Sequence, residues 1–402
     1  MAKNLQFLNY VIYLLLLFYL VIDTITGISL SSTGISFSIP YKLFIMSLMI
    51  VAIGLCNLNH FLVILFYICW LVVSFFVMTI FRSENIYLAI QTYAKFISGL
   101  VFYLYFASLN RVEKRCVLFI KRILLINALV FALNIFAGIL GFGYSTYSYG
   151  IGIKGFFYAG NEIFLILLSI ATLLIQSRNK HIRFITSIVS LVFAVLIGTK
   201  TAMLALFIII SVNFFEKLTS KRKLVFFSCL PLMILAFIFL YTFVLSKTQV
   251  FEHLIYNIQK NRKLTGSLLS ALFSGRLDFL YDNLNLLRKK GNTISLIFGG
   301  NSFYNSKSIE IDFFDAIILN GIFIAISMFL FYSYLIAIAI KRKQKILIVL
   351  NFMILAISFI AGHIWANLTG GLFFIIANVY FYIFKNFQVR RKQYVVKEKL
   401  CL

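Results

Sequence analysis

About twelve apolar segments divide this sequence, and each is long enough, or nearly so, to cross the ~30 Å hydrocarbon core of a bilayer as a helix. Hydrophobic residues make up 62% of the chain and charged residues only 12%, whereas soluble proteins carry about 25% charged residues. With two prolines in 402 residues, most of these helices should run unbroken. We therefore expect an all-α, polytopic membrane protein that forms one membrane domain over residues 1–402. The apolar segments are residues 5–27, 41–58, 60–80, 86–108, 117–139, 161–177, 184–199, 201–215, 224–246, 314–340, 346–363 and 370–385.

The basic residues predict how the chain is oriented. The net charge of +25 is gathered in short clusters between apolar segments, which is typical of an orienting signal and not of nucleic-acid binding. Clusters such as Lys341 to Lys345 fall in alternate connections, and the short connections between them are nearly free of positive charge. This bias predicts that both termini lie in the cytoplasm. The N-terminal apolar segment has no small-residue cleavage site, so we expect it to remain as the first helix.

One long hydrophilic stretch, residues 247–313, interrupts the apolar segments between the ninth and the tenth. The topology places it outside the cytoplasm. It contains Ser274-Gly275-Arg276 at the head of an amphipathic segment. Apolar residues recur there at spacings of three and four, which predicts one face of a helix lying on the membrane surface. These residues are Leu269, Phe273, Leu277, Leu280, Leu284 and Leu287.

Isolated polar residues fall at one common outer depth in this topology. Charged groups near hydrocarbon are unfavourable, by about 2.5–3.5 kcal/mol at a helix centre on insertion scales, so they tend to face a cavity or one another. Their common depth predicts one shared site. Simpler roles stay open: the lysines could extend to the interface, Glu162 could stabilise a helix start, and His363 could be an ordinary interfacial residue. The residues are Lys154, Asn161, Glu162, Lys200, Arg276, Asp312, Asp315 and His363.

The sequence offers little support for a metal site. Glu310 and Asp312 have a spacing that could serve a divalent cation, but two carboxylates alone are weak evidence. The five cysteines are scattered along the chain and none lies in the long loop. We expect neither a metal nor a cofactor.

Four stretches together resemble the O-antigen polymerase and O-antigen ligase superfamily, bacterial membrane enzymes that join lipid-linked sugar repeats outside the cytoplasm. The second stretch has Lys200 where the family has an arginine, which keeps the charge but loses the bidentate fork. The histidine usual in ligases is absent, since Glu310 and Asp312 occupy that region, and this favours a polymerase over a ligase. The stretches are Gly155 to Glu162, Gly198 to Ala202, Ser274 to Arg276 continuing to Asn301, and Glu310 to Gly321.

The resemblance implies a GT-C-like fold in the bacterial cytoplasmic (inner) membrane and a metal-independent glycosyltransferase. The donor would be a glycan on undecaprenyl diphosphate, and the acceptor a second lipid-linked oligosaccharide repeat. Arg276 would bind the diphosphate, with Lys200 and Lys154 as further cations. Asp312 or Asp315, and next Glu162, would accept the proton of the attacking hydroxyl, with Asn161, His363 and Glu310 as further candidates. Membrane lipid, a flippase and a chain-length regulator would be its partners.

Three other functions remain open on the sequence. A ligase would transfer finished glycan to another acceptor. A flippase or transporter would need charged residues along the inner halves of the spans, which are almost bare of charge, and internal symmetry, which is not apparent. A non-catalytic scaffold in a polysaccharide assembly complex would not need the isolated outer polar residues.

Overall fold

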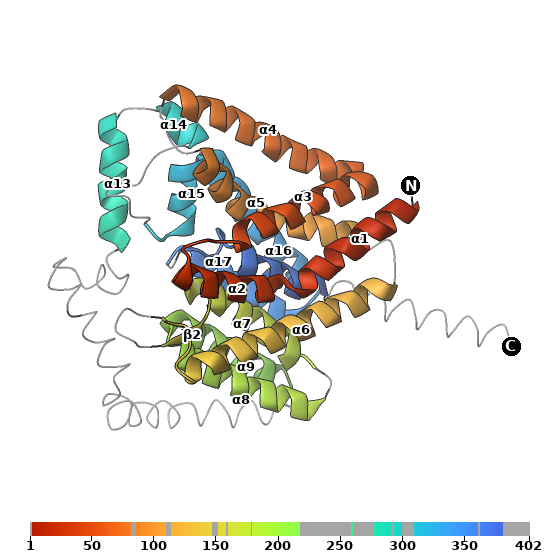
Figure 1. Ribbon diagram of the computed structural model, residues 1–402. Coiled ribbons are helices and arrows are strands. Elements are labelled where there is room, and N and C mark those ends of the chain that lie inside the picture. Colours follow the sequence, from red (N-terminus) through yellow and green to blue (C-terminus); the bar gives the residue numbers. More distant parts are fainter. Residues whose placement is uncertain are drawn as a thin grey trace.

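The computed structural model describes residues 2–81, 86–109, 114–146, 152–157, 160–177, 179–217, 259, 276–290, 293–299, 309–360 and 362–380. These residues form a helical bundle with one small antiparallel hairpin, β1 (Tyr144–Ser145) and β2 (Ile153–Gly155) (Figure 1). The helices are α1 (Ala2–Leu17), α2 (Tyr19–Ser32), α3 (Ser38–Cys56), α4 (Leu58–Phe81), α5 (Ile86–Leu109), α6 (Lys114–Ile139), α7 (Gly160–Ile175), α8 (Lys180–Ile197), α9 (Lys200–Lys217), α13 (Arg276–Lys290), α14 (Thr293–Phe298), α15 (Asp312–Asn320), α16 (Ile322–Lys341), α17 (Lys345–Ser358) and a last helix, Leu368–Tyr380.

Six of the described helices are long and apolar enough to cross a membrane, or seven if the bent pair α1–α2 forms one span. The surface of these helices also indicates a membrane environment, because α8 exposes large apolar side chains such as Phe184, Ile188 and Val195 along its length. A protein surrounded by water rarely exposes an apolar surface of this extent. The number of twelve spans is not shown: α7, α9, α17 and helix Leu368–Tyr380 are shorter, and the ninth apolar segment lies outside the described residues.

The centre of the bundle is formed by α5, α7 and helix Leu368–Tyr380. Buried aromatic and aliphatic side chains cover all sides of these helices, among them Phe102, Phe164 and Phe374. A helix that is apolar around its whole circumference belongs inside a bundle. Their few buried polar residues, such as Ser98, Ser169 and Thr172, lie among these apolar side chains.

The first apolar segment is bent by 47° between α1 and α2. Asn127 of α6 occupies the break: its side-chain oxygen accepts the N–H of Leu20 at 2.9 Å, and its amide donates to the carbonyl of Leu16 at 3.0 Å. The Asn127 amide thus replaces one backbone hydrogen bond of a continuous helix, which is a recognised cause of a sharp bend. After the bend, α2 packs against α3 and α6.

The prediction of one unbroken span over 314–340 is wrong, because the helix breaks at Gly321. This glycine has φ of 88°, and a Cβ at this position would lie 2.0 Å from the carbonyl oxygen of Ile297. Only glycine admits both the left-handed backbone and the close approach of α14. The break separates the short α15, which carries Asp312 and Asp315, from the span α16.

Within the long loop, the predicted helix is confirmed over α13, which lies at the edge of the bundle on the side of α15 (Figure 1), whereas Leu269 and Phe273 of its predicted apolar face lie outside the described residues. Its burial differs in part from the apolar face that we predicted. Asn283 is 1% exposed, whereas Leu284 is 46% exposed. The rest of 247–313 lies largely outside the described residues, so its place relative to the membrane stays a prediction.

Candidate functional site

An ion pair joins the first residue of α13 to the chain just before α15. The guanidinium of Arg276 donates to one oxygen of Glu310 from Nε at 3.1 Å and from Nη2 at 2.8 Å. Its Nη1 donates to the carbonyl of Ile360 at 3.1 Å. The side chains are 19% exposed for Arg276 and 45% exposed for Glu310. Because arginine has five N–H donors, these bonds occupy three and leave two for a ligand.

Asp312, the first residue of α15, is fully buried. Its Oδ1 accepts the backbone N–H of His363 at 2.6 Å, and its Oδ2 accepts those of Ile364 and Trp365 at 2.8 and 2.9 Å. Three consecutive N–H groups thus converge on one carboxylate. This arrangement anchors the turn between α17 and helix Leu368–Tyr380 to the start of α15, and it leaves Asp312 little freedom to reach a substrate.

The backbone beside the ion pair is strained. Among the described non-glycine residues, positive φ values occur at Glu310 (60°), His363 (67°) and Lys343 (55°). Two of these three residues therefore lie at this end of the bundle. Gly362 permits the arrangement, since a Cβ there would lie 2.4 Å from the carbonyl carbon of Glu310. Left-handed backbone at a non-glycine residue is kept only where the surrounding structure enforces it, and it is frequent at functional sites.

Asp315 lies one turn after Asp312 on α15 and is 3% exposed. Its Oδ1 accepts the N–H of Ile309 at 3.0 Å. Burial raises the pKa of Asp312 to about 7, although its three N–H donors and the Arg276 charge act in the opposite direction. Burial, and secondly the neighbouring Asp312, raise the pKa of Asp315 to about 8. Asp315 therefore largely retains its proton at neutral pH, unlike an ordinary carboxyl group, whereas Asp312, which accepts three N–H groups, is partly ionised.

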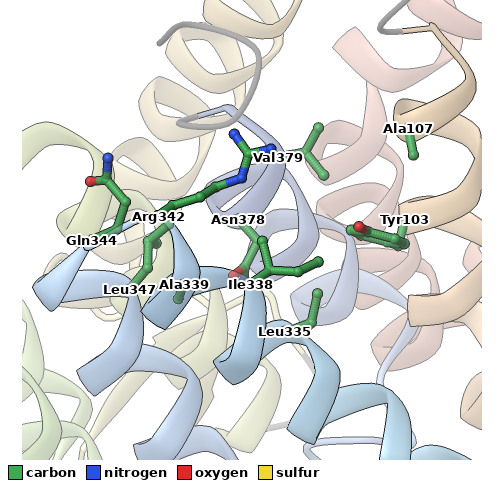
Figure 2. Close-up of a pocket in the computed structure, with 10 residues that line it drawn as sticks. All are labelled: Tyr103, Ala107, Leu335, Ile338, Ala339, Arg342, Gln344, Leu347, Asn378 and Val379. Atoms are coloured by element: carbon green, nitrogen blue, oxygen red, sulfur yellow. The ribbon is translucent and has the colours of Figure 1, made fainter. Parts of the chain in front are cut away.

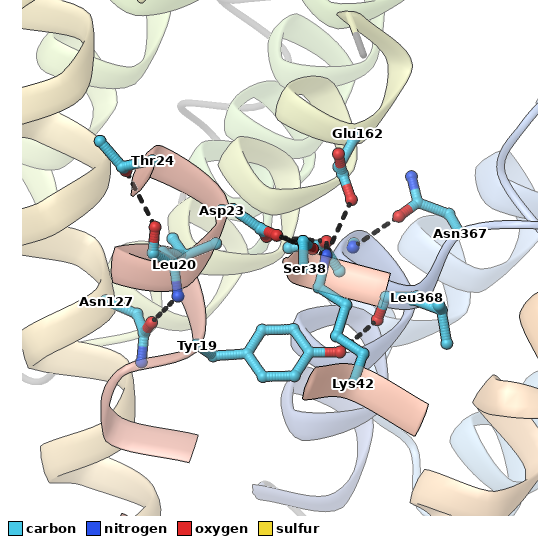
Figure 3. A network of polar contacts seen from close by, with 12 residues as sticks. Tyr19, Leu20, Asp23, Thr24, Ser38, Lys42, Asn127, Glu162, Asn367 and Leu368 are labelled. Atoms are coloured by element: carbon cyan, nitrogen blue, oxygen red, sulfur yellow. Dashed lines mark hydrogen bonds and ion pairs between the residues drawn. The ribbon is translucent and has the colours of Figure 1, made fainter. Parts of the chain in front are cut away.

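A second polar cluster lies deeper in the bundle, around Lys42 of α3 (Figure 3). The Lys42 ammonium lies 2.6 Å from Oδ1 of Asp23 and 3.7 Å from Oε1 of Glu162, with the Lys42 and Asp23 side chains 5% and 7% exposed. Lys42 also donates to the hydroxyl of Thr369, which in turn donates to Oδ2 of Asp23 at 2.9 Å. Ser38 donates to the same carboxylate. Glu162 is therefore part of this cluster and not of the Arg276–Glu310 pair.

The segment from Gly362 to Gly370 connects the two clusters. Asp312 holds its first half, and Thr369 joins its second half to Lys42 and Asp23. Between them, the Asn367 side chain donates to the carbonyl of His363 at 3.3 Å and accepts the N–H of Gly370 at 2.8 Å. Side chains from opposite ends of the chain thus fix one irregular segment inside the bundle.

The other predicted site residues are placed as follows. Lys154 lies in β2, with its ammonium 5.7 Å from the ring centroid of Tyr144, and burial lowers its pKa. Asn161 is the second residue of α7 and Lys200 the first of α9, but their side chains lie outside the described residues. The single shared site predicted from the sequence is therefore divided: Arg276, Glu310, Asp312, Asp315 and His363 are brought together, and Glu162 joins the Lys42 cluster.

Sequence reasoning missed Asp23 and Lys42. Both are isolated charged residues at the edges of predicted apolar segments, and such residues usually face one another or a cavity, so the same rule could have found them. Lys95, in the middle of α5, lies within electrostatic range of Glu162 and His363. In the described part of the chain, no group of three or more His, Cys, Asp or Glu side chains is arranged to hold a metal ion.

Comparison with protein-family models, with curated proteins and with solved structures finds no match for this chain. The fold alone defines its class, a helical membrane protein. Within that class, the particular features of this chain are the Arg276–Glu310 pair and the buried Lys42 cluster at one end of the bundle.

Proposed function

We propose that this protein is a polymerase that joins lipid-diphosphate-linked oligosaccharide repeats into a surface polysaccharide, by glycosyl transfer on the outer face of the bacterial cytoplasmic membrane. The resemblance of its four sequence stretches to the O-antigen polymerase and ligase superfamily suggests the substrate class. The observation that carries the proposal is the Arg276–Glu310 pair, in which a largely buried cation at the start of α13 meets a half-exposed carboxylate on left-handed backbone.

Binding of the donor begins with its diphosphate. Arg276 has two N–H groups beyond those used by Glu310 and Ile360. A dianionic diphosphate also competes with the singly charged Glu310 for the two N–H groups that now bind Glu310. A unit charge pair at 4 Å is attracted by about 4 kcal/mol at an effective dielectric constant of 20. When the Arg276 guanidinium exchanges Glu310 for the diphosphate as its partner, the Glu310 carboxylate is therefore released at the moment when the donor is in place.

The released carboxylate then acts as general base. In this scheme, Glu310 takes the proton from a hydroxyl of the acceptor sugar, whose oxygen forms a bond to the anomeric carbon of the donor. The bond between that carbon and the phosphate oxygen breaks, and the lipid diphosphate leaves with its negative charge against Arg276. We assign the proton to Glu310 in preference to Asp312 and Asp315, because both aspartates are buried and accept backbone N–H groups.

The other residues support this pair. Asp312 positions His363 through the backbone, and Gly362 gives Glu310 the space that its left-handed conformation requires. The Lys42 cluster fixes the far end of the same segment. Lys200 and Lys154 remain further candidates for the second lipid-linked substrate.

The experiment that tests the proposal is the extraction of lipid-linked sugars from cells that carry Arg276→Ala, compared with Arg276→Lys. A polymerase defect gives single lipid-linked repeats without long chains, and the lysine variant recovers part of the activity because it keeps the charge but not the fork. Arg183→Ala is the matched control, since Arg183 lies at the start of α8 and its Nη1 donates to the carbonyl of Ser177.

Other results would redirect or reject the proposal. Normal chains that fail to reach their final acceptor would identify a ligase. Repeats retained in the cytoplasmic leaflet would identify a flippase. Normal chain length and attachment in the Arg276→Ala strain would remove Arg276 from the mechanism and, with it, the observation on which the proposal depends.

A further inference from the structure

A small cavity lies between α5, α16, α17 and helix Leu368–Tyr380, remote from the two polar clusters (Figure 2). Its volume is about 60 Å³. Apolar side chains such as Leu335 and Leu347 form much of its wall, and Arg342, Gln344, Tyr103 and Asn378 supply its polar groups. Figure 2 shows Arg342 extending from the end of α16 toward Val379 on the last helix. The cavity therefore has an apolar wall and a cationic rim.

The cavity lies at the membrane interface opposite to the Arg276–Glu310 pair. Helix α16 begins beside α15 and runs for 20 residues to Lys341, next to Arg342. At 1.5 Å per residue this length is about 30 Å, which matches the thickness of the hydrocarbon core. The ligand of this cavity must therefore come from the other leaflet or from the other aqueous phase.

The turn that forms the rim is built to keep positive charge at the cavity. The N–H of Gln344 donates to the carbonyl of Ala339 at 3.0 Å, and that of Lys343 donates to Ile340 at 2.9 Å. These bonds define a Schellman cap with Lys343 at the left-handed position, where its φ is 55°. Glycine is the usual residue there. A lysine, which strains the backbone, instead completes the run Lys341, Arg342, Lys343, Gln344, Lys345.

The charge that the described residues place at the cavity is positive. Arg342 is the charged residue among those that line it, and Lys341, Lys343 and Lys345 flank it in sequence. In the described part of the chain, no acidic side chain lines the cavity. A cationic rim over an apolar wall at this depth is complementary to an amphiphile with a negatively charged headgroup, such as an anionic phospholipid. A zwitterionic lipid would gain the apolar contact but little from the charge.

We infer that this cavity binds the headgroup of an anionic phospholipid from the leaflet opposite to the proposed catalytic site, with the lipid phosphate at Arg342 and the acyl chains along the exposed apolar side chains of α16, such as Tyr334 and Ile340. The inference does not depend on the proposed function, since it follows from the charge and the depth of the cavity alone. The site would make the stability of the bundle depend on the lipid composition of that leaflet.

The test uses the purified full-length protein after removal of its lipids, with phosphatidylglycerol and phosphatidylcholine as probes in native mass spectrometry. We expect the wild type to retain phosphatidylglycerol at least about fivefold better, a difference of roughly 1 kcal/mol. We expect Arg342→Ala to reduce this preference to near unity and Arg342→Lys to keep part of it. Arg183→Ala, which removes one charge at the start of α8, should leave the preference unchanged.

A measurement on the wild type alone keeps the test decisive if Arg342→Ala does not fold. Phosphatidylglycerol should raise its thermal unfolding temperature more than phosphatidylcholine does, and glycerol phosphate should not reproduce the effect. Equal retention of both lipids, or unchanged retention by a folded Arg342→Ala variant, would overturn the inference. Displacement by glycerol phosphate would assign the site to a soluble anion, and displacement by polyprenyl phosphate would assign it to the lipid carrier; either result contradicts an anionic phospholipid site.

Discussion

The Oδ1 oxygen of Asp312 accepts the backbone N–H of His363 at 2.6 Å, across a separation of 51 residues. The same carboxylate accepts the next two N–H groups of the chain, those of Ile364 and Trp365. Asp312 therefore acts on the backbone of a turn, and through it on the exposed His363 and on Gly362, against which Glu310 packs. Its role in the proposed mechanism is to position these groups.

Replacement of Asp312 by asparagine should disrupt this turn. An amide NH₂ would face at least one of the three backbone N–H groups, and an unsatisfied buried donor costs about 1–3 kcal/mol. We expect a lower thermal unfolding temperature in detergent and the loss of polymer in cells. Asp278→Asn, on the exposed side of α13, is the matched control. Full stability and full polymer in the Asp312→Asn variant would show that the three hydrogen bonds do not hold the turn.

The stability of the protein should depend on the protonation of the aspartate pair. Burial raises the pKa of Asp312 to about 7 and that of Asp315 to about 8, from an ordinary value of 3.8. Between these limits the folded state binds more protons than the unfolded state, so stability falls as the pH rises from about 4 to about 8. We expect a higher unfolding temperature at about pH 5.5 than at about pH 8.5.

The variant Asp315→Asn separates this effect from other titrating groups. It remains uncharged throughout the range, so the fall in stability with pH should become smaller. A stability that rises with pH over the same interval, with the same slope in the wild type and in Asp315→Asn, would contradict the assigned shifts.

Glu310→Gln should separate catalysis from binding of the donor. The amide cannot accept a proton, and loss of a general base typically reduces the rate about 10²–10⁴-fold. Because Arg276 loses its charged partner, the KM for the lipid-linked donor should stay the same or fall. Polymerisation by purified protein measures both constants, and Glu216→Gln, exposed at the end of α9, is the control. A kcat close to that of the wild type would exclude Glu310 as the base.

Lys42→Met should destabilise the protein more than most single substitutions. It leaves the Asp23 carboxylate buried beside Glu162 without its cation, and breaking a buried pair in this way costs about 3–5 kcal/mol. The double variant Asp23→Asn with Lys42→Met should recover much of the loss, because the unpaired charge is gone. Thermal unfolding of the three proteins in detergent tests this, and a double variant less stable than Lys42→Met would show that the pair is not coupled.

The predicted orientation can be tested by labelling single cysteines with a membrane-impermeant maleimide. Tyr281 is 67% exposed on α13, and Lys345 lies just beyond the C-terminal end of α16, whose 20 residues span about 30 Å. In a background in which the five native cysteines are replaced by serine, Tyr281→Cys should be labelled in intact cells, and Lys345→Cys only after permeabilisation. The reverse pattern would invert the topology.

The sequence by itself determined the helical membrane class and the approximate position of most helices. Apolar content along one segment is a local property, and a helix satisfies its backbone hydrogen bonds within that segment, which is what a bilayer requires. The sequence also predicted the α13 helix and drew attention to Arg276, Asp312 and Asp315, because charged residues at the ends of apolar segments are conspicuous.

Only the tertiary structure decided which charges meet. Lys42 and Thr369 are 327 residues apart in the chain, and Tyr19 donates to the carbonyl of Leu368 across 349 residues. No local pattern specifies such partners, since they depend on which helix ends the packing brings together. The break at Gly321 and the capping of Asp312 by three N–H groups likewise follow from contacts with α14 and with the turn at 363–365. The assignment of a residue to chemistry or to positioning depends on burial and hydrogen-bond partners, and both are products of the folded chain.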